Sequence, residues 1–145
     1  MMEYLLVFLG AAIPWFEIAI VIPLGIIKGL HPIIVISLAF TGNMVTIIPL
    51  IFAYDKMKNL LNKRRERKQS KRSERAKMFW NKYGLPGMIM LGPILIGSHI
   101  AAFIGMTLGA TKKATLLWST ISIGCWSVIF GLLTAFGIDI FNPKQ

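Results

Sequence analysis

Apolar residues fall into four long blocks, which are separated by short polar joints and by one charged segment. The blocks cover residues 4–27, 32–54, 83–110 and 114–137. Glycine and proline interrupt the first and third blocks, whereas the second and fourth contain no charged residue. The second block has 23 residues. At about 1.5 Å per residue its helix is about 35 Å long, enough to cross a hydrocarbon core of about 30 Å. The pattern predicts two plain spanning helices and two broken segments.

The interruptions of the first and third blocks predict helix breaks, because proline lacks a backbone N–H and glycine is a poor helix former. The predicted break residues are Pro14, Pro23, Gly25, Gly92, Pro93 and Gly97. A Gly-x-x-x-Gly pair begins near the end of each broken block, at residues 25–29 and 105–109, and a polar joint and a plain block follow it. This order predicts an internal repeat, although glycine and proline are common in membrane helices and such spacings also arise by chance.

The composition is typical of a membrane protein. Of the 145 residues, 55% are hydrophobic and 15% are charged, and the formal net charge is +10; soluble domains are about 25% charged. Residues 55–82 contain 12 of the 16 Lys and Arg residues and 3 of the 6 acidic residues, a net charge of +9. A globular nucleic-acid-binding domain would distribute its basic residues over a folded polar surface, so no nucleic-acid partner is expected. The predicted class is an all-α integral membrane protein.

The charge pattern divides the chain into two membrane halves, 1–54 and 83–137, a basic loop, 55–82, and a short tail, 138–145. The excess of Lys and Arg places the loop in the cytoplasm, and the expected location is the plasma membrane of a prokaryote. Attraction of the loop to anionic lipid headgroups, at about 1 kcal/mol per cationic residue, is the alternative to a purely topological role. The bilayer is thus the first expected partner, and the glycine pairs allow a homodimer.

Two lysines, Lys112 and Lys113, bear on the topology of the second half. If the third block crossed the membrane completely, both would lie outside, against the positive-inside rule. If the block enters and returns to the same face, both stay in the cytoplasm. The same interpretation of the first block places Glu3 and Lys28 outside. The predicted fold therefore has two inverted halves, each a Pro/Gly-broken re-entrant hairpin followed by one transmembrane helix. Four full spans are the alternative.

Glu17 is the sharpest candidate for chemistry, because it is the only acidic residue inside an apolar block. An ionised carboxylate at the centre of the membrane costs about 2.5–3.5 kcal/mol on insertion scales. Such a residue can bind a cationic substrate, carry a proton, or do both in competition. The alternative is that it lies at an interface or caps a broken helix.

Three further polar residues are predicted to contribute to a binding site. Asn43 lies in the middle of the second block, and Ser98 and His99 follow the Gly92-Pro93 break. Asn43 is equally well explained as an interhelical hydrogen-bonding group, and an isolated histidine is more often structural. With one cysteine and two separated histidines, no disulfide framework, metal site or cofactor is predicted. No nucleophile–base pair is recognisable, so no catalytic residue and no enzyme activity are expected.

Several short motifs along the chain resemble those of one membrane protein family. They are Phe16-Glu17, Ile22-Pro23-Leu24-Gly25, Gly42-Asn43, Tyr83-Gly84, Gly92-Pro93, Gly97-Ser98 and Ala101-Ala102. The pattern resembles the small multidrug export proteins, which are distant relatives of the DedA superfamily. The resemblance implies opposed re-entrant hairpins and an export or lipid-translocation activity. Two positions depart from the family pattern: Ala19 stands where an arginine is frequent, and Ile94 to Gly97 replace a Pro-Gly-Thr-Gly-like turn.

The function predicted from these features is secondary export of small amphipathic molecules, preferentially cations, coupled to protons through Glu17. The hypothesised cycle alternates substrate and proton on that carboxylate, in a cavity between the hairpin tips. One alternative is a DedA-like lipid-carrier translocase that moves an anionic headgroup across the bilayer. Another is a membrane protein without transport activity whose basic loop recruits partners.

Overall fold

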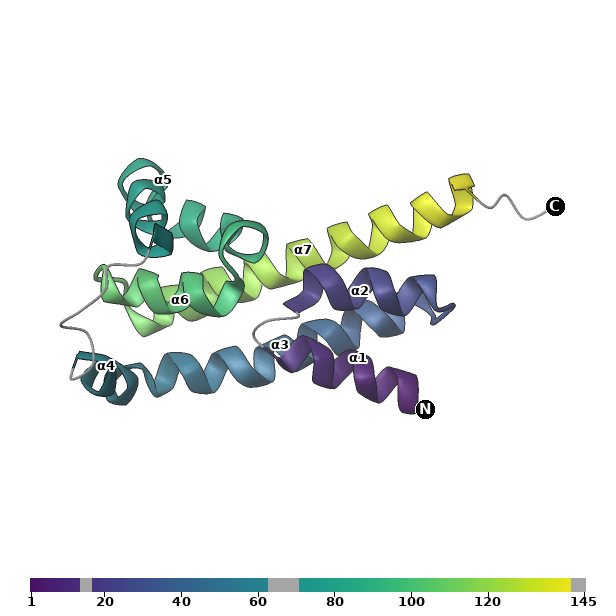
Figure 1. Cartoon of the computed structure of the whole chain (residues 1–145), viewed down its shortest axis with the longest axis horizontal. Coiled ribbons are helices and arrows are strands. Elements are labelled where there is room, and N and C mark those ends of the chain that lie inside the picture. The colour runs from purple at the N-terminus through teal and green to yellow at the C-terminus, as the bar shows by residue number, and fades with distance from the viewer. Residues whose placement is uncertain (14–16, 63–70, 142–145) are drawn as a thin grey trace. The chain divides into compact units, whose positions relative to one another are not determined.

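The computed structural model describes residues 1–13, 17–62 and 71–141, and every regular element in these ranges is a helix (Figure 1). The helices are α1 (Met2–Ala12), α2 (Glu17–Ile27), α3 (Pro32–Phe52), α4 (Tyr54–Asn62), α5 (Lys71–Leu95), α6 (Ser98–Thr107) and α7 (Lys112–Phe141). Among the described helices, α3 and α7 are long and apolar enough to cross a membrane. The predicted all-α class is therefore confirmed for these ranges, and the two plain blocks form the two helices that are candidate membrane spans.

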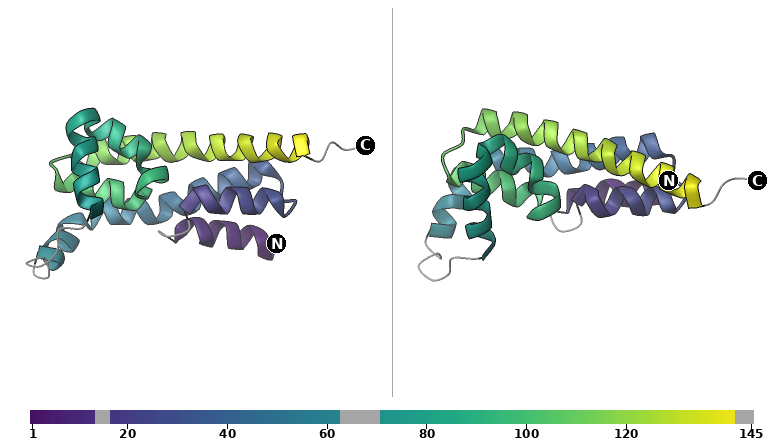
Figure 2. Two further views of the ribbon diagram at one scale, coloured as in Figure 1. Left: turned by 45° about the horizontal axis from the view of Figure 1, so that its top comes forward. Right: turned by 90° about the horizontal axis from the view of Figure 1, so that it is seen from above.

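The short apolar helices are too short to cross a bilayer. Helices α1 and α2 have 11 residues each and α6 has 10, so each is only about 15–17 Å long. That length is about half of the hydrocarbon core. Helix α1 packs on α2, and α6 packs on the longer helix α5; Figure 2 shows the members of each pair side by side.

The first compact unit consists of residues Met1–Thr46 and Ile123–Gln145. Glycines allow its helices to approach closely. A Cβ atom added at Gly10 of α1 would lie 3.2 Å from a Val21 methyl group of α2. One added at Gly25 of α2 would lie 3.0 Å from Val35 of α3 and 3.2 Å from Val7 of α1. Side chains at either glycine would push the helices apart.

The second unit consists of residues Ile47–Ser122. Its helix α5 bends at Gly84, where φ is 67° and ψ is −166°, a conformation that favours glycine. The part of α5 after this bend packs on α6 through two glycines. A Cβ atom at Gly92 would lie 2.6 Å from that of Ala101, and one at Gly105 would lie 2.9 Å from Met88. The second pair thus has a glycine contact on each arm, as the first pair has.

The same helix end occurs in both units. The Leu30 N–H donates to the Gly25 carbonyl (3.2 Å) and the Gly29 N–H to the Ile26 carbonyl (2.9 Å). The corresponding bonds in the second unit, 80 residues later, run from Ala110 to Gly105 (3.0 Å) and from Gly109 to Met106 (3.2 Å). Gly29 and Gly109 have φ values of 85° and 114°. Both ends are Schellman motifs, which require a residue with positive φ. The two Gly-x-x-x-Gly pairs therefore end α2 and α6 and turn the chain into α3 and α7.

Buried positions also recur at an interval of 80 residues. On the short helices the buried pairs are Ile18/Ser98, Val21/Ala101, Ile22/Ala102, Gly25/Gly105 and Ile26/Met106. On the long helices they are Val35/Thr115, Ala39/Ser119, Gly42/Ser122, Asn43/Ile123, Ile47/Ser127 and Ile51/Gly131. Each unit therefore combines one short-helix pair with the first part of one long helix and the last part of the other.

In the first block, two of the predicted break positions are wrong. Pro23 and Gly25 lie inside the continuous helix α2. Pro23 removes only one N–H from the helix, and the buried Ile22 and Ile26 beside it hold α2 against its neighbours. Gly25 serves close packing instead of a break. The predicted break at Pro14 lies outside the described residues.

In the second pair the chain breaks at Gly97, one of the predicted residues, and not at the predicted Gly92 and Pro93. Gly92 and Pro93 belong to the last turn of α5, and the break itself lies at Ile96 and Gly97. The Gly92 carbonyl accepts hydrogen bonds from both of these N–H groups, at 3.1 and 2.7 Å. The segment predicted as a basic loop, 55–82, is helical over α4 and again from Lys71 onward.

Candidate functional site

Ser98 and His99 form a buried polar pair at the start of α6, in the second unit. Each is 3% exposed, and the Ser98 Oγ lies 3.3 Å from the His99 Nδ1. Gly97, directly before them, has φ 97° and ψ 141°, a conformation in which glycine is strongly favoured. The glycine ends the chain reversal and directs both side chains into the interior. The structure thus brings two of the predicted site residues together.

A hydrogen bond from α7 compensates for the proline at the end of α5. Pro93 has no N–H, so the Ile89 carbonyl four residues earlier loses its helical donor. The Ser122 hydroxyl donates to this carbonyl at 2.8 Å, and Ser122 is fully buried. An unsatisfied carbonyl would be costly in an apolar environment. Ser122 therefore links the last part of α5 to α7 through a hydrogen bond.

Ser122 belongs to a buried polar stripe on α7, none of whose residues was predicted as a site residue. Thr115, Ser119 and Ser122 are buried and are spaced by four and three residues, which places them on one helix face. Thr115 Oγ1 donates to the Thr111 carbonyl at 2.9 Å. The buried Ser119 hydroxyl has no hydrogen-bond partner in the part of the chain that the structure describes. The spacing of these hydroxyl residues in an otherwise apolar span is the signal that would have revealed the stripe.

Asn43 lies in the first unit, in the middle of α3, and is fully buried. The neighbouring Gly42 packs against the backbone carbonyl of Phe8, where a Cβ atom would overlap with that oxygen. Phe8 is one turn before the end of α1. Asn43 is thus held at the level at which α1 ends, and its own carbonyl accepts a hydrogen bond from Thr46 Oγ1 at 3.0 Å.

Glu17 is the first residue of α2, and its side chain lies outside the part of the chain that the structure describes. The first turn of a helix favours a carboxylate, because the first backbone N–H groups have no intrahelical acceptor. With the 80-residue interval, Glu17 corresponds to Gly97, directly before the Ser98–His99 pair. The predicted polar residues of α2 and α6 therefore lie at the starts of these helices, with Glu17 one position earlier than Ser98 in the repeat register.

Contacts in the second unit fix where the chain returns after α6. Lys112, at the start of α7, donates to Asp55 Oδ2 at 2.7 Å and to the Phe52 carbonyl at 3.4 Å. Tyr54 donates to Thr107 Oγ1 at 3.2 Å. The end of α6 and the start of α7 therefore lie beside the junction of α3 and α4. Asp55 and Lys112, the two ends of the intervening segment, are therefore in direct contact.

The first unit has a corresponding contact. The backbone N–H of His31, directly before α3, donates to the Tyr4 hydroxyl near the start of α1 at 3.3 Å. The chain therefore runs along α1, turns, and returns along α2 to the level at which it began.

No group of three metal-ligating side chains is present among the described residues.

Comparison with known proteins gives one match. The sequence profile of the family described as "Putative small multi-drug export protein" matches residues 17–129. No curated protein and no solved structure matches the chain.

Proposed function

The chain belongs to this small multi-drug export protein family, and we propose that it is an integral membrane transporter that exports small amphipathic cations. The two helices long enough to span a membrane, α3 and α7, support the membrane location. The preference for cations rests on Glu17, the single acidic residue within the first apolar block. An acidic residue within a membrane segment is most simply explained by a substrate or proton that it binds.

The proposed topology has α1–α2 and α5–α6 as re-entrant hairpins that enter from opposite faces of the membrane. The observation that carries it is the ion pair between Lys112 and Asp55, with 2.7 Å between Nζ and Oδ2. These residues flank the basic segment and the second helix pair, so the chain between them enters and leaves on one face. The positive-inside rule makes that face cytoplasmic. Because α3 crosses the membrane in this topology, α1 and α2 then enter from the opposite face.

The equivalence of the two halves supports an inverted-repeat transporter. The caps and buried positions recur at an interval of 80 residues, and transporters of this type place their binding sites where broken helices end near the midplane. We assign substrate and proton binding to the polar residues predicted from the sequence. Glu17 binds substrate or proton in alternation, while Asn43, Ser98 and His99 supply hydrogen bonds to a bound molecule.

The coupling role is tested with Glu17→Gln, which keeps the side-chain size and removes the charge. The full-length protein is reconstituted into proteoliposomes, and transport of ethidium, a lipophilic cation, is followed under an imposed pH gradient. We expect transport of Glu17→Gln to lose its dependence on the gradient. Glu17→Asp is the matched control and should retain it, because the carboxylate remains. Gradient-driven transport by Glu17→Gln at the normal rate would contradict the role.

A further inference from the structure

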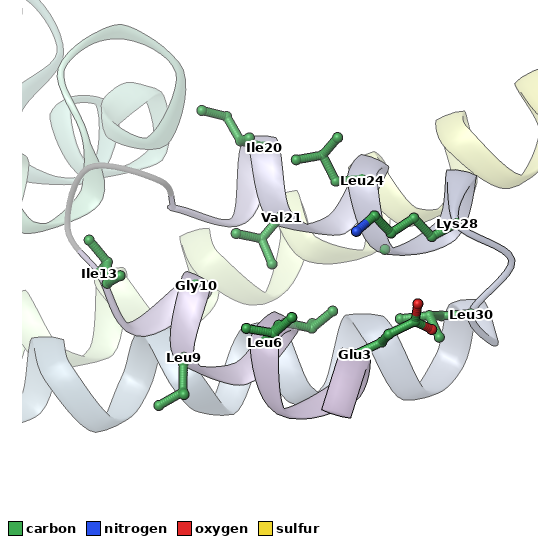
Figure 3. Close-up of a pocket in the computed structure, with 12 residues that line it drawn as sticks. Glu3, Leu6, Leu9, Gly10, Ile13, Ile20, Val21, Leu24, Lys28 and Leu30 are labelled. Atoms are coloured by element: carbon green, nitrogen blue, oxygen red, sulfur yellow. The ribbon is translucent and has the colours of Figure 1, made fainter. Parts of the chain in front are cut away.

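An apolar groove with a volume of about 450 Å³ runs between α1 and α2 in the first unit (Figure 3). Aliphatic side chains form most of its wall: Leu6, Leu9, Ile13, Ile20, Val21 and Leu24. Gly10 and Gly25 also line it, and their missing side chains leave room between the two helices. None of the residues proposed to bind the transported substrate lines this groove.

The groove carries charge at one end only. Glu3 and Lys28 line this end, whereas Ile13 and Ile20 line the other (Figure 3). No ion pair joins Glu3 to Lys28 within the described residues. Tyr4, whose hydroxyl accepts the His31 N–H, marks the same end as the polar boundary, since tyrosines favour the membrane interface. A ligand that fits must have an apolar body and, at one end, both a positive and a negative group.

The length of the groove narrows the choice of ligand. From Glu3 to Ile13 the chain advances ten residues along α1, which is about 15 Å at about 1.5 Å per residue. The hydrocarbon core is about 30 Å thick, so each leaflet contributes about 15 Å. The groove therefore matches one acyl chain of one leaflet, and its charged end coincides with the headgroup region.

We infer that this groove binds a phospholipid with a zwitterionic amine headgroup, such as phosphatidylethanolamine. One acyl chain lies between α1 and α2, the phosphate accepts hydrogen bonds from Lys28, and the ammonium group donates to Glu3. The inference rests on the proposed insertion of α1 and α2 into one leaflet but not on the transported substrate. Lipid binding is measured without transport, so a failure of either proposal is recognised separately.

The test uses native mass spectrometry of the purified full-length protein in detergent. Phosphatidylethanolamine, phosphatidylglycerol and diacylglycerol with identical acyl chains are titrated in turn. We expect phosphatidylethanolamine to bind most tightly. Lys28→Gln should weaken binding of both phospholipids about tenfold, the effect of one lost hydrogen bond between charged groups. Glu3→Gln should weaken phosphatidylethanolamine alone and so remove its advantage over phosphatidylglycerol.

Two tryptophan variants test the location. Leu24, which is 54% exposed and lines the groove, is compared with Leu117 of α7, which is 58% exposed. Leu24→Trp fills the groove and should abolish the bound phosphatidylethanolamine, whereas Leu117→Trp should leave it unchanged. Equal loss in both variants would assign the lipid to the general surface and overturn the inference. Diacylglycerol binding as tight as that of phosphatidylethanolamine would overturn it too, as would a Leu24→Trp variant that changes the oligomeric state while its bound lipid is unchanged.

Discussion

The long helices α3 and α7 bury the same register of positions, 80 residues apart, but fill these positions with different chemistry. On α3 the buried residues include Val35, Ala39 and Ile47, whereas the equivalent residues on α7 carry hydroxyl groups. These are Thr115, Ser119 and Ser127. One pair of positions is reversed, since the amide Asn43 on α3 corresponds to an isoleucine on α7. The two long helices therefore bury equivalent positions with different side chains, mostly apolar on α3 and partly hydroxyl-bearing on α7.

The two units also attach their short helices to the long ones differently. At position 42 the first unit has a glycine, against which the backbone of Phe8 packs directly. At the equivalent position the second unit has Ser122, which donates a hydrogen bond to the Ile89 carbonyl. The difference follows from Pro93, because its missing N–H creates a need for a donor in the second unit. A repeat can thus keep its geometry while the residues at its contacts change.

The largest effect is expected when the residue of the second unit is placed in the first, as Gly42→Ser. The new Cβ atom would overlap with the Phe8 carbonyl, and a backbone atom cannot move away as a flexible side chain can. Overpacking of this kind costs about 3 kcal/mol or more. Thermal unfolding in detergent should show a strongly lowered midpoint. The control is Gly137→Ser, where no atom lies within 4 Å of the added Cβ; equal midpoints for the two variants would refute the close contact.

A smaller loss is expected for Ser122→Ala, which leaves the Ile89 carbonyl without a donor. The expected cost is about 1–3 kcal/mol, measured by the same unfolding assay. Pro93→Ala restores a backbone N–H at the right place, so the cost of Ser122→Ala should largely disappear in that background. Ser127→Ala is the matched control on α7, because the Ser127 hydroxyl has no partner among the described residues. Additive effects of Ser122→Ala and Pro93→Ala would show that the hydroxyl does not compensate for the proline.

The glycine contacts of the two helix pairs differ in tightness, and alanine substitutions should rank them. A Cβ atom at Gly92 would lie 2.6 Å from that of Ala101, whereas one at Gly10 would lie 3.2 Å from a methyl group of Val21. After the gain in helix propensity, Gly92→Ala should destabilise by about 1 kcal/mol and Gly10→Ala by clearly less. Ala101→Gly should rescue Gly92→Ala. Equal unfolding midpoints for the two alanine variants would contradict the ranking.

The smallest effect is expected for Asp55→Asn, which breaks the ion pair with Lys112. The side chains are 72% and 38% exposed, so the pair contributes about 0–1 kcal/mol and less at high salt. Unfolding at low and high ionic strength should show a small difference that salt removes. Lys113→Gln is the control, since no ion pair of Lys113 occurs in the described ranges. A decrease of several kcal/mol in the free energy of unfolding would contradict this estimate and show that the ion pair contributes strongly to the stability of the unit.

The two long helices and the matching helix ends were the features most accessible from the sequence. Long uncharged blocks predict α3 and α7 directly, and the glycine pairs point to equivalent helix ends. The breaks were less predictable, because a proline such as Pro23 interrupts a helix only when packing does not compensate for the lost hydrogen bond. The periodicity of Thr115, Ser119 and Ser122 is visible in the sequence, but the partner of Ser122 is not.

Contacts between distant residues were beyond sequence reasoning. Asp55 and Lys112 are 57 residues apart, and nothing local at either residue predicts the other. The groove between α1 and α2 also depends on packing, because Glu3 and Lys28 share one end only when the two helices lie side by side. The assignment of Glu17, Asn43, Ser98 and His99 to a substrate site remains a prediction.

Site-directed labelling of single cysteines tests the opposed entry of the two helix pairs most directly. With the native Cys125 replaced by alanine, Lys28→Cys, Lys56→Cys and Lys113→Cys are introduced one at a time, and a membrane-impermeant maleimide is applied to each face of the membrane. We expect positions 56 and 113 to be labelled from the same face, the cytoplasmic one, and position 28 from the opposite face. Labelling of position 113 from the face opposite to position 56 would contradict it.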